Sequence, residues 1–269
     1  MSRVISRSFN IYAMLYFVLY KILRYRYAVV LQNLSRSFPE RSYADISQVA
    51  AGFYRHFCRI FLEMGMMFFV SERKMKNRVR VKNPELLEQF HAKGQNIIIM
   101  LGHYGNWESL NILPRYFNFN LYAVYKPLSN AFFNRVMQRL RSRFGLRLLP
   151  MHKVGRHMLT KKAQAGAYIL VSDQFPPNEA HTVRFLHQPT RVITGAERLA
   201  KTTGATVVYA SVKKTAGPAD WEISFRLICD APAVSLPYEI THKFTEYLEE
   251  DIRENPQYWL WTHRRWKQQ

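Results

Sequence analysis

The seven residues Gly102–Glu108 (GHYGNWE) have the residue types and the spacing of an acid–base site. The imidazole of His103 precedes the carboxylate of Glu108 by five positions. On a continuous helix the two side chains would diverge by roughly 140°, so they meet only if the backbone bends between them. Gly105 can supply that bend, and Asn106 is a suitable helix N-cap. The pattern predicts that Glu108 accepts a proton from one imidazole nitrogen and leaves the other free as a general base.

The motif follows directly after Asn96–Leu101 (NIIIML), an apolar run typical of a buried parallel strand. Polar groups at the carboxyl end of such a strand are the usual place for a site in an α/β sheet. The alternative interpretation of His103 and Glu108 is a structural histidine whose hydrogen bonds are satisfied within the fold. The strand end, together with the glycine and the capping residue, favours function over that alternative.

Further apolar runs predict the rest of the sheet. Similar strands are expected at Leu121–Tyr125, Ala167–Ser172 and Ala205–Val212, and the alternation after Trp221 predicts a half-buried strand near an edge. Because helical patterns alternate with these runs, the expected fold is α/β, with a mostly parallel central sheet flanked by helices.

Three helices have recognisable ends. Ser42 and Asp45 form a capping box before a long amphipathic helix over Tyr43–Val70, and Thr194 with Glu197 resembles a second capping box. The last long helix begins at Pro237 and ends at Asn255 and Pro256. We find no repeat or linker, so the expected organisation is an N-terminal segment over residues 1–40 and one domain over residues 41–269.

The charge indicates an anionic partner. There are 39 Lys and Arg against 19 Asp and Glu, a formal charge of +20. Nucleic acid, an anionic lipid surface and an acidic protein all fit this balance. Between Glu108 and Asp173 there is no acidic residue, which predicts a face that binds phosphate or carboxylate. The basic residues of this span are Arg115, Lys126, Arg135, Arg139, Arg141, Arg143, Arg147, Lys153, Arg156, Lys161 and Lys162.

The N-terminus has the composition of a membrane interface. Its first 39 residues contain no acid and include the apolar, aromatic run Phe9–Leu23, with Arg3 and Arg7 before it. This run is shorter than the ~20 residues needed to cross a bilayer, so we expect a helix that lies in or on the membrane. The alternative is an ordinary buried first helix. The C-terminal residues from Trp259 to Arg265 suit either a membrane anchor or a packed terminus with a basic tail.

The GHYGNWE segment looks like the His-x4-Asp/Glu motif of glycerolipid-type acyltransferases. More closely, the chain resembles the late acyltransferases of lipid A biosynthesis, the lauroyl/myristoyl transferase family. Similar blocks follow the order of that family over nearly the whole chain. They are Asn33–Ser42 (NLSRSFPERS), Val124–Pro127 (VYKP), Arg139–Ser142 (RLRS), Ser172–Pro177 (SDQFPP), Ile193–Ala205 (ITGAERLAKTTGA) and Asn255–Lys267 (NPQYWLWTHRRWK).

The resemblance implies a role for particular residues. Carried over by position, His103 is the base, Glu108 its orienting partner, and Arg141 and Asp173 are supporting polar residues. Lys126 stands where the family block usually has arginine, and lysine lacks the planar fork that binds two oxygens at once.

The resemblance also implies a place and a reaction. It implies an enzyme of lipopolysaccharide synthesis at the cytoplasmic face of a bacterial inner membrane. The expected donor is acyl-acyl carrier protein, and the expected acceptor is a hydroxyl of an anionic glycolipid such as a lipid A precursor. Attack of an alcohol on a thioester needs a base and a donor for the oxyanion, but no metal and no redox cofactor. Arg141 or a nearby cation would bind phosphate or stabilise that oxyanion.

The remaining residues favour direct transfer. Cys58 and Cys229 have no activating motif, and there is no G-x-S-x-G, so no acyl-enzyme is expected. A basic nucleic-acid-binding protein is a rival interpretation, although no binding module is recognisable and no nucleic-acid partner is expected. A metal-dependent hydrolase with His103 and Glu108 as ligands is another, and an acyltransferase for an aminolipid or lysophospholipid is a third.

Overall fold

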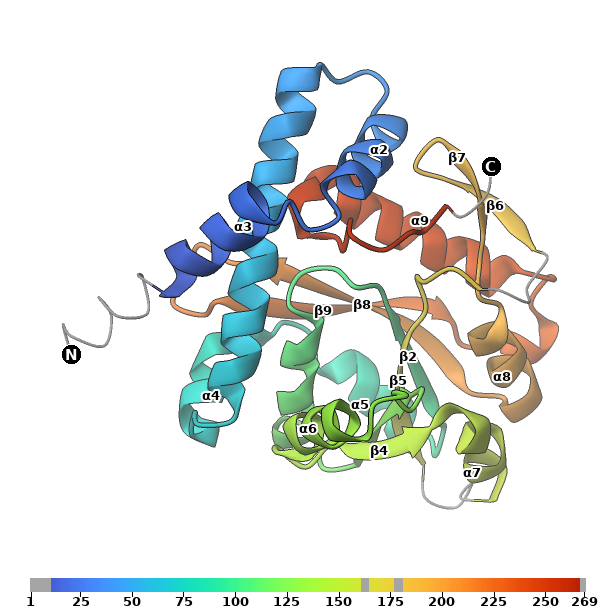
Figure 1. Ribbon diagram of the computed structural model, residues 1–269. Coiled ribbons are helices and arrows are strands. Elements are labelled where there is room, and N and C mark those ends of the chain that lie inside the picture. Colours follow the sequence, from blue (N-terminus) through green and yellow to red (C-terminus); the bar gives the residue numbers. More distant parts are fainter. Residues whose placement is uncertain (1–10, 161–164, 177–180, 267–269) are drawn as a thin grey trace.

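In a computed structural model that describes residues 11–160, 165–176 and 181–266, the chain forms an α/β fold around one large sheet (Figure 1). The expected fold class is confirmed: every pair of neighbouring strands is parallel except β8 with β9. In spatial order the strands are β1 (Val79–Val81), β9 (Trp221–Cys229), β8 (Thr206–Lys214), β2 (Ile97–Leu101), β5 (Gly166–Val171), β3 (Asn120–Tyr125) and β4 (Arg147–Pro150). A separate hairpin pairs β6 (Thr182–Phe185) with β7 (Gln188–Arg191).

Helices cover both faces of the sheet (Figure 1). The α-helices are α2 (Tyr27–Ser37), α3 (Tyr43–Met67), α4 (Glu72–Arg78), α5 (Glu85–Ala92), α6 (Ala131–Ser142), α7 (Val154–Thr160), α8 (Gly195–Thr203) and α9 (Glu239–Glu254). The short 3-10 helices are η2 (Trp107–Arg115), η3 (Met151–Lys153), η4 (Pro232–Val234) and η5 (Pro256–Tyr258), and η1 (Phe17–Ile22) is a π-helix.

Strand β2 lies at the centre of the sheet and is buried along its whole length. Its side chains alternate between two cores, as the two-residue period of a strand requires. Ile98 and Met100 pack with residues of α2, α3, α8 and α9, whereas Ile97 and Ile99 pack with residues of α5, η2 and α6. The strand is therefore held on both faces, and the loop that follows it starts from a fixed point.

Helix α3 begins as the sequence predicts. The Ser42 hydroxyl accepts the Asp45 backbone N–H, and the Asp45 carboxylate accepts the Ser42 N–H, so the capping box is confirmed. The helix ends at Met67, three residues before the expected end at Val70. One long face of α3 lies along the loop that follows β2, and this brings it beside the site.

The second expected capping box is wrong. The Thr194 hydroxyl makes no capping hydrogen bond with a backbone N–H of α8, and it accepts instead from the Arg198 guanidinium at 2.7 Å. Glu197 is instead buried, and its carboxylate accepts the backbone N–H groups of Tyr238 and Thr241. It therefore satisfies the N-terminus of α9, a helix forty residues away, because a buried carboxylate finds its strongest partners among unpaired N–H groups.

The N-terminal segment is helical from residue 11, and η1 continues that helix. Among the described residues, none of the helices combines the length and the apolar character that crossing a bilayer requires. Several large apolar side chains of the N-terminal segment are exposed, among them Met14, Phe17 and Ile22. Arg3, Arg7 and Phe9 belong to the expected anchor but lie outside the described residues, as do Lys161 and Lys162 of the basic span. The domain boundary at residues 40 and 41 stays a prediction.

Candidate active site

Two neighbouring strands place His103 beside Asp173. His103 follows β2 by two residues, and Asp173 follows β5 by two residues. These strands are parallel neighbours, paired from Ile97 with Ala167 to Leu101 with Val171, so their carboxyl ends open at the same edge of the sheet. Gly102 makes the close approach possible, because a Cβ there would lie 2.6 Å from a methyl group of Leu248 and 3.1 Å from the Asp173 carboxylate.

The imidazole of His103 is held by this carboxylate. His103 Nδ1 lies 2.6 Å from Asp173 Oδ1, and the His103 backbone N–H donates to Oδ2 at 2.8 Å. The Trp259 indole N–H donates to the same Oδ2 at 2.8 Å. Burial disfavours the charged carboxylate, but the imidazole and these donors outweigh it and lower the pKa of Asp173 to about 2. An ionised Asp173 accepts the Nδ1 proton and leaves Nε2 as the free nitrogen.

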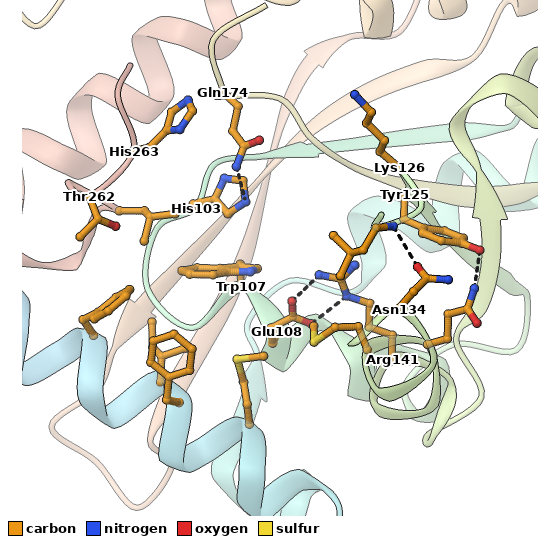
Figure 2. Close-up of a pocket in the computed structure, with 18 of the residues that line it drawn as sticks. His103, Trp107, Glu108, Tyr125, Lys126, Asn134, Arg141, Gln174, Thr262 and His263 are labelled. Carbon is orange, nitrogen blue, oxygen red and sulfur yellow. Dashed lines mark hydrogen bonds and ion pairs between the residues drawn. The ribbon is translucent and has the colours of Figure 1, made fainter. Parts of the chain in front are cut away.

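The predicted contact between His103 and Glu108 is wrong. Figure 2 shows Trp107 beside the imidazole, with Glu108 directed toward Arg141. The Glu108 carboxylate accepts two hydrogen bonds from the Arg141 guanidinium, at 2.5 and 3.1 Å. Glu108 is only 3% exposed, so its charge requires a buried or half-buried cation, and α6 presents one. Whether Glu108 takes part in catalysis stays a prediction, but it does not orient the imidazole.

One cavity is lined both by His103 and by the ion pair of Glu108 with Arg141. It has a volume of about 460 Å³, and His103, Trp107, Glu108 and Arg141 all lie on its wall. This volume is within the range of small-ligand sites. The α3 side is apolar, whereas the side formed by β3, the following loop and α6 is mixed and carries the cations Lys126 and Arg141. The α3 residues on the wall are Phe57, Ile60, Phe61 and Met64, and those of β3, the following loop and α6 include Tyr125, Lys126, Asn134, Met137 and Gln138.

The Nε2 atom of His103 faces this cavity. Gln174 places its side-chain nitrogen 3.4 Å from Nε2, which agrees with an unprotonated nitrogen that can accept a hydrogen bond. The side chain of His103 is 17% exposed, whereas that of Asp173 is 4% exposed. The imidazole of His103 is thus accessible, and its partner Asp173 is shielded from water.

The loop between His103 and Glu108 is held from behind by α3. Gly105 has a φ of +59°, and a Cβ there would lie 2.1 Å from the Val212 carbonyl oxygen, so the turn requires glycine. The Gly105 carbonyl oxygen lies 3.2 Å from His56 Nε2, and its N–H donates to the Tyr258 carbonyl. The sequence predicts that Asn106 caps the following helix, but its side chain makes no capping bond to η2. The Asn106 amide instead donates to the Glu63 carboxylate at 2.6 Å.

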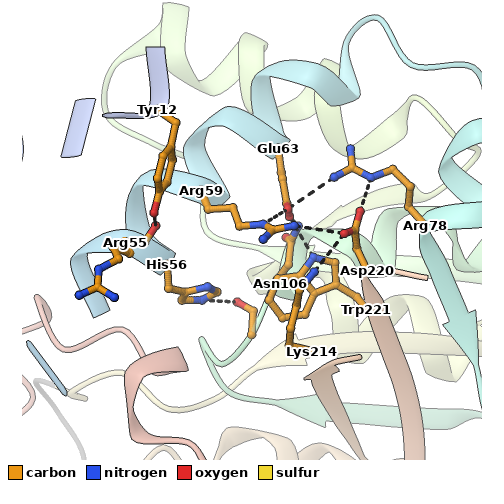
Figure 3. Close-up of polar contacts among 11 residues, drawn as sticks. Tyr12, Arg55, His56, Arg59, Glu63, Arg78, Asn106, Lys214, Asp220 and Trp221 are labelled. Atoms are coloured by element: carbon orange, nitrogen blue, oxygen red, sulfur yellow. Dashed lines mark hydrogen bonds and ion pairs between the residues drawn. The ribbon is translucent and has the colours of Figure 1, made fainter. Parts of the chain in front are cut away.

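Glu63 is the centre of a larger polar network behind the site (Figure 3). Its carboxylate is 4% exposed and accepts the Trp221 indole N–H at 2.9 Å and the Arg59 Nε–H at 2.8 Å. Arg59 and Arg78 also form ion pairs with Asp220 and so connect it to Glu63. Asp220 forms a further ion pair with Lys214. The network joins α3, α4 and β9 to the loop after β2, so it fixes the loop that begins with His103.

A family model for bacterial lipid A biosynthesis acyltransferases matches residues 3–268. The chain belongs to this family. A lipid A biosynthesis acyltransferase from Haemophilus influenzae (strain ATCC 51907 / DSM 11121 / KW20 / Rd) is 21% identical over 234 residues, which is 85% of this chain and 72% of the relative. The resemblance drawn from the sequence motifs is confirmed, and the chain is an acyltransferase.

In this acyltransferase, the structure brings together all the residues that were predicted for the site. His103, Glu108, Lys126 and Arg141 line the cavity, and Asp173 lies directly behind His103. The sequence predicts only a supporting role for Asp173, although the run SDQ follows its strand just as GHY follows NIIIML. Trp259 and Gln174 were not predicted as partners of Asp173 and His103, because nothing in their own segments indicates which loop they contact.

The C-terminus of the acyltransferase packs into the fold. Trp261 is fully buried, Trp259 is 2% exposed and Arg265 is 3% exposed. The Asn33 amide on α2 donates to the carbonyl oxygens of Trp261 and His263. Of the two expectations for this segment, the packed terminus is therefore the one observed, with only Arg264 of its arginines exposed.

A metal site is not supported by the described geometry. Within residues 11–160, 165–176 and 181–266, no three His, Cys, Asp or Glu side chains are grouped to hold a metal ion. His103 and Glu108 have separate partners, so they are not placed as a ligand pair. Cys58 is buried and Cys229 half-buried, and burial raises the pKa of both thiols.

The buried His56 makes the stability of this region depend on pH. Burial lowers its pKa to about 3 from an ordinary value near 6.5. Between these values the unfolded chain binds a proton that the folded chain does not, so stability is complete above pH 6.5 and falls as the pH decreases toward 3. Well between the two values, the slope is roughly 1.4 kcal/mol per pH unit. We expect the urea-unfolding free energy to fall between pH 7.0 and 5.5 by about 1 kcal/mol more than in His56→Gln.

Glutamine is the suitable replacement because its amide can still donate to the Gly105 carbonyl. An equal pH dependence in both proteins would show that His56 accepts its proton in the folded state.

Proposed function

We propose that this acyltransferase moves a fatty acyl group from acyl-acyl carrier protein to a hydroxyl of a phosphorylated lipid A precursor. His103 is the general base, and Asp173 holds its imidazole in place. The observation that carries the proposal is a carboxylate-bound imidazole whose Nε2 faces a cavity with one apolar wall and one wall that carries Lys126 and Arg141. An acyl thioester and an anionic acceptor need these two walls.

The proposed step is direct. His103 Nε2 takes the proton of the acceptor hydroxyl while the hydroxyl oxygen attacks the thioester carbonyl carbon. The C–O bond forms, and the carbonyl oxygen becomes an oxyanion. When the intermediate collapses, the C–S bond breaks, and the leaving thiolate receives the proton from the imidazolium. Asp173 stabilises the imidazolium between the two transfers and remains ionised throughout.

The cationic wall suits the acceptor phosphate. Arg141 has two donors engaged by Glu108, and Lys126 lies on the same wall. We therefore assign the phosphate to Lys126, with Arg141 as the further cation near the reacting carbonyl. A lysine contacts phosphate as a point charge, which is a looser contact than an arginine fork.

The membrane part of the proposal rests on the surface near the cavity. Phe61 and Leu128 line the cavity and are each about half exposed, at 49% and 51%. Further exposed apolar side chains are Phe69, two residues after α3, and Phe132 and Phe133 at the start of α6. Apolar side chains among basic residues favour the surface of an anionic bilayer, from which a lipid acceptor would enter.

The direct test is an assay of the product. The purified full-length protein is incubated with a series of acyl-acyl carrier protein thioesters and with anionic vesicles that contain a lipid A precursor, an aminolipid or a lysophospholipid. We expect mass spectrometry to show one acyl mass added to the lipid A precursor. Acylation of only the aminolipid or lysophospholipid would identify a different acceptor, and transfer to none of them would contradict the proposal.

The apolar wall predicts a change in chain-length preference. Met64 lies on the α3 side of the cavity and is half-buried. We expect Met64→Trp to lower kcat/KM for the longest donor that the native enzyme uses by about 10-fold, and to change that for a donor four carbons shorter by less than about 3-fold. The reason is that each CH₂ group excluded from the wall loses about 0.8 kcal/mol of burial.

Competition between the two donors in one reaction gives the ratio directly by mass spectrometry. Met66→Trp, at an exposed position on the same helix, is the matched control. An unchanged ratio in Met64→Trp would show that the acyl chain does not lie along α3.

A further inference from the structure

Arg265 is a buried cation without hydrogen bonds at two of its side-chain nitrogens. The residue is 3% exposed, and its Nε and Nη1 atoms have no partner within the described part of the chain. A guanidinium in this position is unfavourable, because burial removes water from the charge without replacing its hydrogen bonds. Burial lowers the pKa of Arg265 to about 10, and the negative charge of Asp173 partly opposes that effect.

Arg265 and Asp173 line a second, smaller space that shares no lining residue with the cavity. This small space of about 10 Å³, the size of one water molecule, is lined by Arg265, Asp173 and Ser172. Its other walls are mainly apolar side chains: Phe185, Val192, Phe244 and Leu248. Charges in such surroundings interact more strongly than they would in water.

We propose that Arg265 is a positioning residue that acts on His103 through the buried carboxylate of Asp173. The catalytic role inferred here for Arg265 rests on the proposed function. The electrostatic coupling of Arg265 to Asp173 and His103 does not depend on that function. The guanidinium adds a positive charge near the Asp173 carboxylate without competing for Oδ1 and Oδ2, which already bind the imidazole and two other N–H donors. The same positive charge is unfavourable beside a positively charged imidazolium, because like charges repel strongly in apolar surroundings. One water in the small space would join the guanidinium to the carboxylate.

Other charged or titratable groups lie near His103 and Asp173. They must be the same in the native protein and in the Arg265 variants. Those on the cavity side or behind the carboxylate are Arg26, Glu108, Lys126, Arg141, Tyr209 and His263. None of them is altered by a change at Arg265. Arg264 gives a matched control because it is the neighbouring residue with the same charge, and it is exposed.

The test compares Arg265→Met, Arg265→Lys and Arg264→Met by two measurements. The first is the NMR titration of the His103 ring, assigned with His103→Gln. The second is the pH profile of kcat/KM. For Arg265→Met we expect the midpoint of the ring titration and the acid limb of the profile to move upward by about half a pH unit or more. Arg265→Lys and Arg264→Met should keep the native midpoint.

The outcomes separate this inference from the proposed function. A midpoint in Arg265→Met equal to that in Arg264→Met would overturn the inference, as would an activity loss that is the same at every pH. The NMR titration does not require activity, so it decides the coupling even if His103 proves not to be the base. If Arg265→Met does not fold, Arg265→Gln makes the same change of charge and keeps polar atoms beside the small space.

Discussion

Replacing His103 with glutamine is expected to lower kcat/KM for acyl transfer by about a thousandfold or more. A glutamine side chain has no basic nitrogen, and a positioned general base contributes about 10² to 10⁴ in rate. The backbone contacts of this position remain, because its N–H donates to Asp173 and its carbonyl accepts from Leu260. The fold should therefore survive, with a native circular dichroism spectrum and melting temperature.

His152→Gln is the control for loss of a histidine, since this side chain is exposed on η3. Initial rates with one donor and one acceptor are sufficient for the comparison. A rate for His103→Gln within 10-fold of the native rate would exclude His103 as the base.

Replacing Asp173 with asparagine is expected to lower activity by about three orders of magnitude, although the shape of the side chain barely changes. Oδ2 accepts two N–H groups, from the His103 backbone and the Trp259 indole, so the amide oxygen must occupy that place. The amide NH₂ group then faces His103 Nδ1 and donates to it. This forces the proton onto Nε2, where the base must be free, and a tautomer change of this kind is known to reduce rates by up to about 10⁴.

Asp251→Asn is the matched control for Asp173→Asn. Asp251 is another carboxylate on the same side of the sheet, 3% exposed, and it accepts hydrogen bonds from Tyr209 and Ser211. We expect its replacement to reduce the melting temperature more than the rate. If Asp173→Asn and Asp251→Asn lost similar fractions of activity, the effect at Asp173 would be one of stability.

The sequence was sufficient for most of the sheet because its central strands are long and apolar. The runs at Asn96–Leu101, Leu121–Tyr125, Ala167–Ser172 and Ala205–Val212 correspond to β2, β3, β5 and β8, with ends that differ by one or two residues. The short strands β1 and β4 have three and four residues, which is too few for a periodic pattern to show. The hairpin of β6 and β7 was missed for the same reason.

The partner of His103 was not predictable from local spacing. Glu108 is near in sequence, but η2 is a 3-10 helix that turns its side chain toward Arg141. Asp173 is seventy residues away and becomes a neighbour only because β2 pairs with β5. Strand order is a property of the whole fold, and apolar runs of similar composition do not determine which of them lie side by side.

Buried charges were the other feature that the sequence did not reveal. Glu197 resembles half of a local capping box, and Arg265 lies in a basic C-terminal tail, yet both are buried and interact with distant groups. Residue type predicts exposure for Glu and Arg in general. The exceptions depend on what the tertiary structure places beside them, and here they lie at the start of α9 and behind Asp173.

The most direct test of the His103–Asp173 pair is the activity of the double variant His103→Gln/Asp173→Asn, measured with both single variants in the same assay. If Asp173 acts only by orienting the imidazole, the double variant should be no slower than His103→Gln alone, within about 3-fold. A double variant slower by the product of the two single losses would contradict the account, because Asp173 would then act independently of His103.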